Sequence, residues 1–162
     1  MNIAVGVLYS QKILLFCFMR NLNKHARSLK KKWEWIQEGS PEGLKGQASE
    51  RLFDQMTTIL MNRGHLPWLA LVKKATAVED LFMKIDFKLD ARTEKEDGCE
   101  RFWIGIQIKS SFTGAQSFLE SNRDSKIHVV VMDQVIDLDL LHEKLDSIYL
   151  EELERRYQPA RI

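Results

Sequence analysis

The chain has 162 residues, of which 44% are hydrophobic and 29% are charged, and these proportions are typical of one soluble domain. The formal net charge of +1 conceals an asymmetry, because residues 1–81 contain twelve Lys and Arg against seven Asp and Glu, whereas residues 82–162 contain twelve against sixteen. Two cysteines, Cys17 and Cys99, lie far apart, which argues against a disulfide framework or a thiolate metal cluster and favours a reducing, cytoplasmic setting.

The first nineteen residues contain two apolar runs, residues 3–9 and 13–19, separated by three polar residues. The runs are too short for a membrane-spanning helix, and their flanks do not match a secretory signal. We therefore expect no membrane association. Two interpretations remain open: a strand or helix added to the edge of the core, or a reading-frame extension that precedes a natural start at Met19.

Residues 20–37 show apolar positions at alternating steps of four and three, which predicts an amphipathic helix. The rest of this segment is strongly basic. The residues that we expect to contact a nucleic-acid backbone are Lys24, Arg27, Lys30, Lys31 and Lys32. A solvated face of a docked helix is an equally good interpretation, and the apolar stripe can also pair two chains in a homodimer.

Residues 39–43 are rich in turn-forming types, which indicates a linker between an N-terminal extension, residues 1–38, and a main domain, residues 39–162. The elements expected in the main domain are a helix over residues 47–63, strands over 68–77, 82–90 and 102–109, a helix over 113–122, a strand over 127–132 and a helix over 137–157. This order predicts an α/β fold with a mixed central sheet flanked by helices.

Two of the expected strands place polar groups on one face of an otherwise apolar ribbon. Side chains alternate faces along a strand, so Lys84, Asp86, Lys88 and Asp90 share one side of the second strand. On the third strand, Gln107 and Lys109 project together, opposite a row of isoleucines. If the strands pair as a hairpin, a carboxylate, an amide and an ammonium converge at a site for a divalent cation and a phosphate.

The order Glu50, Asp86 and Gln107-Ile108-Lys109 resembles the PD-(D/E)XK nuclease superfamily, and is most similar to its Holliday-junction-resolvase-like and small endonuclease branches. The resemblance covers residues 46–133. It implies a restriction-endonuclease-like αβββαβ core, which is the element order expected above. It also implies a metal-dependent endonuclease that hydrolyses phosphodiester bonds, with DNA as the expected substrate and RNA left open.

The resemblance also assigns roles to individual residues. Asp86 would be the principal ligand of Mg²⁺, or alternatively of Mn²⁺, with the Gln107 side-chain oxygen and the Ile108 carbonyl completing the protein ligands. Glu50 would bind the metal directly or through water, and Lys109 would hold the attacking water and stabilise charge on the phosphate. The two residues expected to contact a phosphate are Ser110 and Ser111.

The chain departs from the family pattern at one position, because the second acidic residue of the motif is Gln107 here. The change removes a negative charge from the metal site, which weakens cation binding. Glu50 can supply the missing charge, and Asp80 and Asp90 are weaker candidates for this role. Two alternatives to an active nuclease therefore stay open: a catalytically inactive nuclease-fold protein that binds nucleic acid, and a protein-interaction module.

Overall fold

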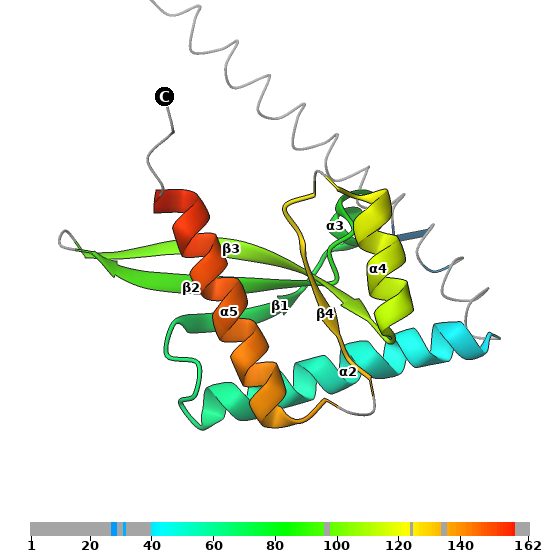
Figure 1. Ribbon diagram of the computed structural model, residues 1–162, viewed down its shortest axis with the longest axis horizontal. Coiled ribbons are helices and arrows are strands. Elements are labelled where there is room, and N and C mark those ends of the chain that lie inside the picture. The colour runs from blue at the N-terminus through cyan, green and yellow to red at the C-terminus, as the bar shows by residue number, and fades with distance from the viewer. Residues whose placement is uncertain are drawn as a thin grey trace, which may run out of the picture.

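The fold is an α/β arrangement of one four-stranded sheet and helices (Figure 1), in a computed structural model that describes residues 27–28, 31, 40–95, 98–123, 125–133 and 136–157. The elements in chain order are α2 (Pro41–Asn62), β1 (Leu69–Lys74), α3 (Ala77–Met83), β2 (Phe87–Lys95), β3 (Gly98–Lys109), α4 (Phe112–Ser121), β4 (His128–Val131) and α5 (Leu138–Tyr157).

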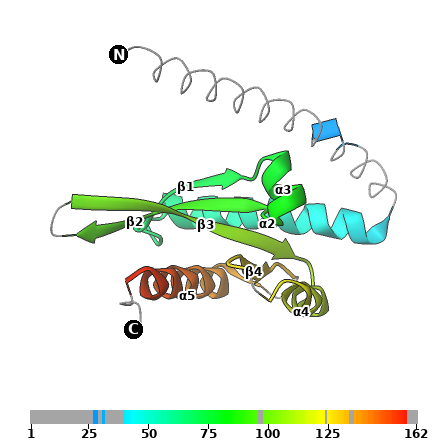
Figure 2. The same cartoon turned by 90° about the horizontal axis from the view of Figure 1, so that it is seen from above.

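The sheet is mixed, as the sequence predicts, and its strands follow chain order, β1-β2-β3-β4. The first three strands are antiparallel neighbours, whereas β4 runs parallel to β3. A parallel neighbour requires a crossover, and α4 supplies it. Figure 2 shows the sheet from its edge, with α5 running beside the long β2–β3 hairpin.

The core forms where one apolar face of the sheet packs against α2 and α5. Alternate residues of β2 and β3, beginning at Phe87 and Phe102, point into it and are buried. From α2, the fully buried ring of Phe53 lies 5.0 Å from the ring of Phe87. The α5 residues that pack against this face are Leu141, Leu145 and Ile148. The opposite face of the same strands is therefore left for polar groups.

The predicted linker at residues 39–43 is wrong, because α2 begins at Pro41. The side chain of Ser40 caps this helix by accepting a hydrogen bond from the Gly43 N–H at 3.1 Å, and Pro41 occupies its first turn. Ser and Pro are favoured at these helix positions as strongly as they are in loops. Glu50, expected in the first helical turn, consequently lies in the middle of α2.

The predicted strand over residues 82–90 is wrong in its first half, and the strand predicted over 68–77 ends early, at Lys74. Between them lies α3, whose start is a capping box. Thr76 Oγ1 accepts from the Glu79 N–H, and a Glu79 carboxylate oxygen accepts from the Thr76 N–H at 2.8 Å. The helix ends at Lys84, which adopts a left-handed backbone conformation with φ 58°.

The later elements agree with the sequence predictions. The structure confirms a helix at α4, a strand at β4 and a long helix at α5, although only Val130 of β4 is fully buried. Asp137 caps α5, because its carboxylate accepts from the Leu140 N–H at 2.9 Å. The third strand is longer than predicted, since β3 begins at Gly98 within the polar hairpin tip.

The basic N-terminal segment is described at only three residues. Arg27, Ser28 and Lys31 are helical and exposed, in agreement with the predicted helix. Lys24, Lys30 and Lys32 lie outside the described residues, as do the apolar runs before Met19. Among the helices that the structure describes, none has both the length and the apolar character needed to cross a bilayer.

The buried ring of Phe53 provides a test of this core. We expect Phe53→Ala to lower the free energy of unfolding by about 3–5 kcal/mol, because the substitution removes contacts and leaves a cavity beneath the sheet. Urea unfolding followed by circular dichroism measures this change. The matched control is Leu44→Ala, since Leu44 lies on the same helix but is 55% exposed. Equal losses in the two variants would contradict this packing.

Candidate active site

Asp86 is a buried carboxylate at the junction of α3 and β2. Its backbone N–H donates to the Ile106 carbonyl at 2.8 Å, which anchors the residue to β3. One side-chain oxygen, Oδ2, accepts from the Gln107 Nε2 at 2.5 Å and from the Ile108 N–H at 2.6 Å. Asp86 and Gln107 are both buried. The predicted convergence of these two side chains is therefore observed.

The Gln107 amide nitrogen occupies a position surrounded by oxygen acceptors. Besides the Asp86 carboxylate, it approaches the Ile108 carbonyl oxygen at 3.5 Å. Two of the oxygens assigned to metal binding thus point at a single donor atom. Within the described residues, Asp86 Oδ1 has no hydrogen-bond partner, so this oxygen remains available to a further ligand.

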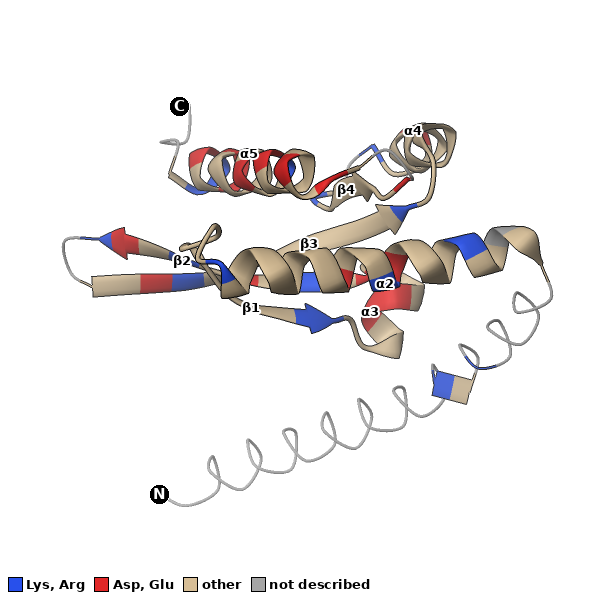
Figure 3. Cartoon of the chain, turned by 90° about the horizontal axis from the view of Figure 1, so that it is seen from below, with Lys and Arg blue, Asp and Glu red and all other residues tan. Residues whose placement is uncertain are grey.

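Two further predicted residues act on Asp86 through their charges. The Lys109 ammonium lies 4.9 Å from the centre of the Phe118 ring on α4, which holds this side chain against the sheet. Glu50 on α2 forms an ion pair with Lys74, at the end of β1, at 2.8 Å. Figure 3 shows the basic end of β1 and the acidic α3 in the same region as α2. The charges of Glu50 on α2 and of Lys109 on β3 therefore both act on Asp86.

Burial controls the protonation of Asp86. Loss of solvent raises the pKa of this carboxyl from 3.8 to about 7, with the negative charges of Glu50 and Asp80 adding to the increase. The Ile108 N–H and the Lys109 ammonium oppose it, because both stabilise the ionised form. Near neutral pH, Asp86 is therefore poised between an acid and a metal-binding anion.

Other acidic candidates fall into two groups. Asp80 lies in the first turn of α3, close enough to raise the pKa of Asp86. Asp90 is buried and bound by Arg101, whose Nε donates to Asp90 Oδ1 at 3.1 Å, so its carboxylate is already engaged. Lys84, predicted on the same strand face as Asp86, instead ends α3.

The two serines expected to contact a phosphate have different surroundings. Ser111 is the N-cap of α4, and its hydroxyl accepts from the Gly114 N–H at 3.2 Å. The helix start therefore already uses this side chain. Ser110 is half-buried between β3 and that helix.

Lys74 is the one member of the site that sequence analysis did not identify. It follows Lys73 at the end of β1, and two adjacent lysines in a strand give no signal of which one turns toward α2. The 2.8 Å contact with Glu50 depends on how α2 crosses the sheet. Only the tertiary structure supplies that information.

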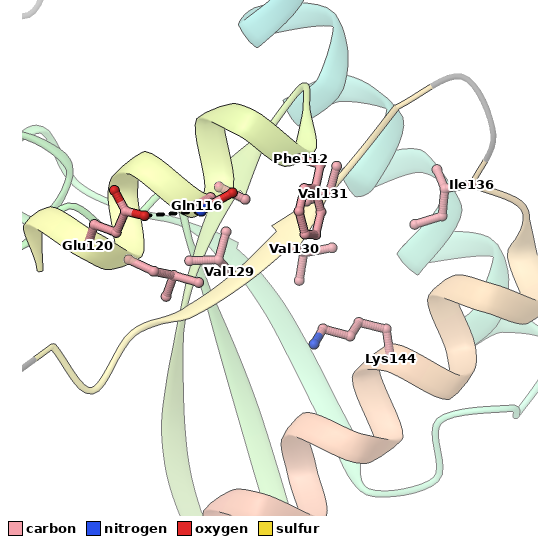
Figure 4. Close-up of a pocket in the computed structure, with 10 residues that line it drawn as sticks. Phe112, Gln116, Glu120, Val129, Val130, Val131, Ile136 and Lys144 are labelled. Carbon is pink, nitrogen blue, oxygen red and sulfur yellow. Dashed lines mark hydrogen bonds between the residues drawn. The ribbon is translucent and has the colours of Figure 1, made fainter. Parts of the chain in front are cut away.

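A cavity of about 420 Å³ lies elsewhere, between α4, β4 and α5. Figure 4 shows Val129 and Val131 from β4, Phe112 from α4 and Lys144 from α5 around it. Its lining is mainly apolar, and it includes none of the residues that converge at Asp86. The candidate active site is thus separate from this cavity.

The comparisons with protein-family models, curated proteins and solved structures found no match for this chain. Its chemistry must therefore be argued from the site itself. Within the described residues, no group of three or more His, Cys, Asp and Glu side chains is placed to hold a metal ion. A cation at Asp86 would accordingly depend on amide and carbonyl oxygens as well as carboxylates, and such ligands suit a hard ion such as Mg²⁺.

The raised pKa of Asp86 makes stability depend on pH. Between about pH 4 and 7 the folded chain keeps a proton that the unfolded chain has released, so this group's contribution to stability is lost as pH rises through that window. One pKa unit corresponds to about 1.4 kcal/mol. Between pH 4 and pH 8, we expect the free energy of unfolding of the wild type to fall by roughly 2–4 kcal/mol more than that of Asp86→Asn, which has no carboxyl group at this position.

Urea unfolding at a series of pH values, without divalent cations, measures this difference. Asp54→Asn is the control, because Asp54 is exposed on α2. Parallel stability curves for the wild type and Asp86→Asn would show that the Asp86 carboxyl titrates normally.

Proposed function

We propose that this chain is a metal-dependent endonuclease that hydrolyses phosphodiester bonds in DNA. The observation that carries the proposal is the convergence of the Asp86 carboxylate and the Ile108 carbonyl on the Gln107 amide, 2.5 and 3.5 Å from its nitrogen. Asp86 lies just before β2, and Gln107 and Ile108 lie on β3, which is the chain order on which the resemblance to the PD-(D/E)XK pattern is based. A chance alternation of polar residues on a solvent-facing hairpin would leave them exposed, and both Asp86 and Gln107 are buried.

The element order also supports the proposal. Apart from α3, the chain runs helix, three antiparallel strands, helix and a parallel strand, which matches the αβββαβ order of a restriction-endonuclease-like core. In this interpretation α3 is an addition between the first and second strands, and it brings Asp80 toward Asp86. We include the restriction-endonuclease-like core in the proposal.

The donor set fits Mg²⁺ or Mn²⁺. Asp86 and the Ile108 carbonyl would hold the ion, and rotation of the Gln107 amide exchanges its nitrogen for an oxygen ligand. Glu50 would contribute a second carboxylate on releasing Lys74. When bound, such an ion activates a water molecule and neutralises charge on the phosphate.

Lys109 has the role of a positioning and charge-stabilising residue. Its ammonium carries three donors, which can orient a water molecule and a phosphate oxygen together. The contact with Phe118 limits the freedom of the side chain before substrate binds. Basic residues on the N-terminal helix, including the exposed Arg27 and Lys31, would bind the DNA backbone.

Substitution of the two central residues tests the proposal. We expect Asp86→Ala and Lys109→Ala each to reduce Mg²⁺-dependent cleavage by about 100-fold or more, because they remove metal binding and stabilisation of the transition state, respectively. DNA affinity should persist in both variants. Cleavage of labelled DNA, with and without Mg²⁺, measures activity, and fluorescence anisotropy measures affinity.

Lys144→Ala is the matched control, since Lys144 is an exposed lysine on α5. Cleavage that survives in Asp86→Ala would refute the assignment of this site.

A second function is favoured by the same contact. In the described arrangement the Gln107 amide donates to the Asp86 carboxylate, which satisfies that group without a cation. A protein with this arrangement can keep the fold and bind nucleic acid without cutting it. This alternative predicts salt-sensitive binding and no cleavage in either Mg²⁺ or Mn²⁺.

Gln107→Glu distinguishes the two functions. The substitution restores a second negative charge beside Asp86 and removes the amide donor, so we expect tighter Mg²⁺ binding by isothermal titration calorimetry. In an active nuclease, the wild type already cleaves and the variant needs less Mg²⁺. In an inactive binder, only the variant cleaves. Unchanged Mg²⁺ affinity would show that position 107 does not contact the metal.

A further inference from the structure

Besides its polar groups, the face of the sheet opposite the core exposes two large apolar side chains, one on β1 and one on β3. In register, Leu71 of β1 and Trp103 of β3 both lie opposite Asp90 of β2. Leu71 is 47% exposed and Trp103 is 46% exposed. Figure 2 shows α5 on only one side of the β2–β3 hairpin. We call the row formed by Leu71, Asp90 and Trp103, with the cations beside it, the open sheet face.

A β-bulge places Leu71 on this face. Leu69 pairs with Ala91 and Leu71 pairs with Asp90. The pairing therefore moves two residues along β1 for one residue along β2, which leaves one extra residue in β1. In a regular strand, Leu69 and Leu71 would point to the same side, and Leu69 is buried in the core. The bulge turns Leu71 outward instead, at the cost of exposing a leucine. Leu71 and Trp103 are therefore both exposed on this face, one on each side of β2.

One cation lies over the Trp103 ring, and two more basic residues lie on the same face of the sheet. The Lys88 ammonium lies 5.2 Å from the centre of the ring and pairs with Glu79 of α3 at 2.5 Å. Lys73 lies opposite Lys88 on β1, and no described residue forms an ion pair or hydrogen bond with its side chain. Arg101 contacts Asp90, which neutralises the only carboxylate in the row. The surface therefore combines an exposed aromatic ring with the charge of Lys73, since Lys88 and Arg101 are each paired with a carboxylate.

The open sheet face and the candidate active site lie on the same side of β3, with the buried Ile85 between them. Trp103, Gly105 and Gln107 are alternate residues of β3, so they follow one another on the same side of the strand. Ile85 fills the space above Gly105, because a Cβ there would lie 3.1 Å from Ile85 Cδ1. Four residues of strand span about 13 Å, which corresponds to about four stacked nucleotides.

We propose that the open sheet face binds single-stranded nucleic acid, with one unpaired base stacked on Trp103 and the strand leading to Asp86 and Lys109. The inference rests on the proposed function and names its substrate class: a single strand, or a duplex that is unpaired beside the cut. Base stacking on aromatic side chains beside cations is the common mode of single-strand binding. Paired bases inside a duplex cannot present a face to this ring, so duplex DNA lacks the contact.

Substitution of Trp103 tests the inference on the full chain. Trp103→Ala should weaken binding of a labelled 20-nucleotide single strand by about 5- to 150-fold, whereas Trp103→Phe should retain most of the affinity because it keeps a stacking ring. Affinity for the matching duplex should not change. Leu150→Ala is the control, since Leu150 is a 57% exposed apolar residue on α5.

Lys73→Ala provides a second measurement that does not alter packing. It should reduce the salt dependence of single-strand binding by about 0.7 in the logarithmic slope, the value for loss of one phosphate contact. Circular dichroism and urea unfolding establish that each variant is folded. If Trp103→Ala is unfolded, the single-strand affinities of Trp103→Phe and Lys73→Ala are used instead. An unchanged salt dependence of single-strand binding in Lys73→Ala overturns the inference.

The two proposals fail in different ways. If the wild type neither binds nor cuts any nucleic acid, the proposed function fails, and the inference with it. If the wild type cuts in a manner that requires Asp86, but folded Trp103→Ala keeps its single-strand affinity and its ratio of single-strand to duplex cleavage, only the inference is overturned. Tighter binding of duplex than of single strand by the wild type also overturns it.

Discussion

The candidate site depends on one buried contact, in which the Asp86 carboxylate receives hydrogen bonds from the Gln107 amide and the Ile108 N–H. A carboxylate that has lost its solvent needs donors or a cation, because an unpaired buried charge is strongly unfavourable. The contact joins the start of β2 to the end of β3, so the same interaction fixes the geometry of the sheet and of the site. Any ligand that replaces the amide must supply comparable stabilisation.

Strand alternation explains how one sheet serves both packing and chemistry. The same stretch of β3 directs Ile104, Ile106 and Ile108 into the core and Gln107 and Lys109 to the other face. Rigid apolar packing beneath the strand therefore holds the polar groups above it in place. A functional site built on regular strands is more exactly positioned than one built on loops. Along the same face, the bulge in β1 adds Leu71 to a surface that regular alternation would not have formed.

Local patterns predicted much of this structure. The amphipathic period identified α5, and the polar residues of an apolar strand identified Gln107 and Lys109. The pattern failed over residues 82–86, where alternating charges favoured a strand although the Thr76-x-x-Glu79 capping box starts a helix that reaches Met83. Contacts between distant elements could not be foreseen, because the pairing of Glu50 with Lys74 follows from the packing of α2 against a sheet already formed. The sequence thus located the strand residues of the site, and tertiary structure defined their charge environment.

The glutamine at position 107 sets the balance between folding and metal binding. With glutamate there, two adjacent carboxylates would face Glu50 and Asp80, and their repulsion would raise the pKa of Asp86 further unless a cation were bound. The neutral amide removes one charge and donates a hydrogen bond, so it gives the buried Asp86 carboxyl group a partner with no ion present. The same substitution must weaken the attraction for a cation, since ligand charge contributes directly to affinity. Glutamine at position 107 therefore stabilises the metal-free state and lowers the affinity for metal. Glu50, which pairs with Lys74 in the metal-free state, is the carboxylate placed to restore that affinity.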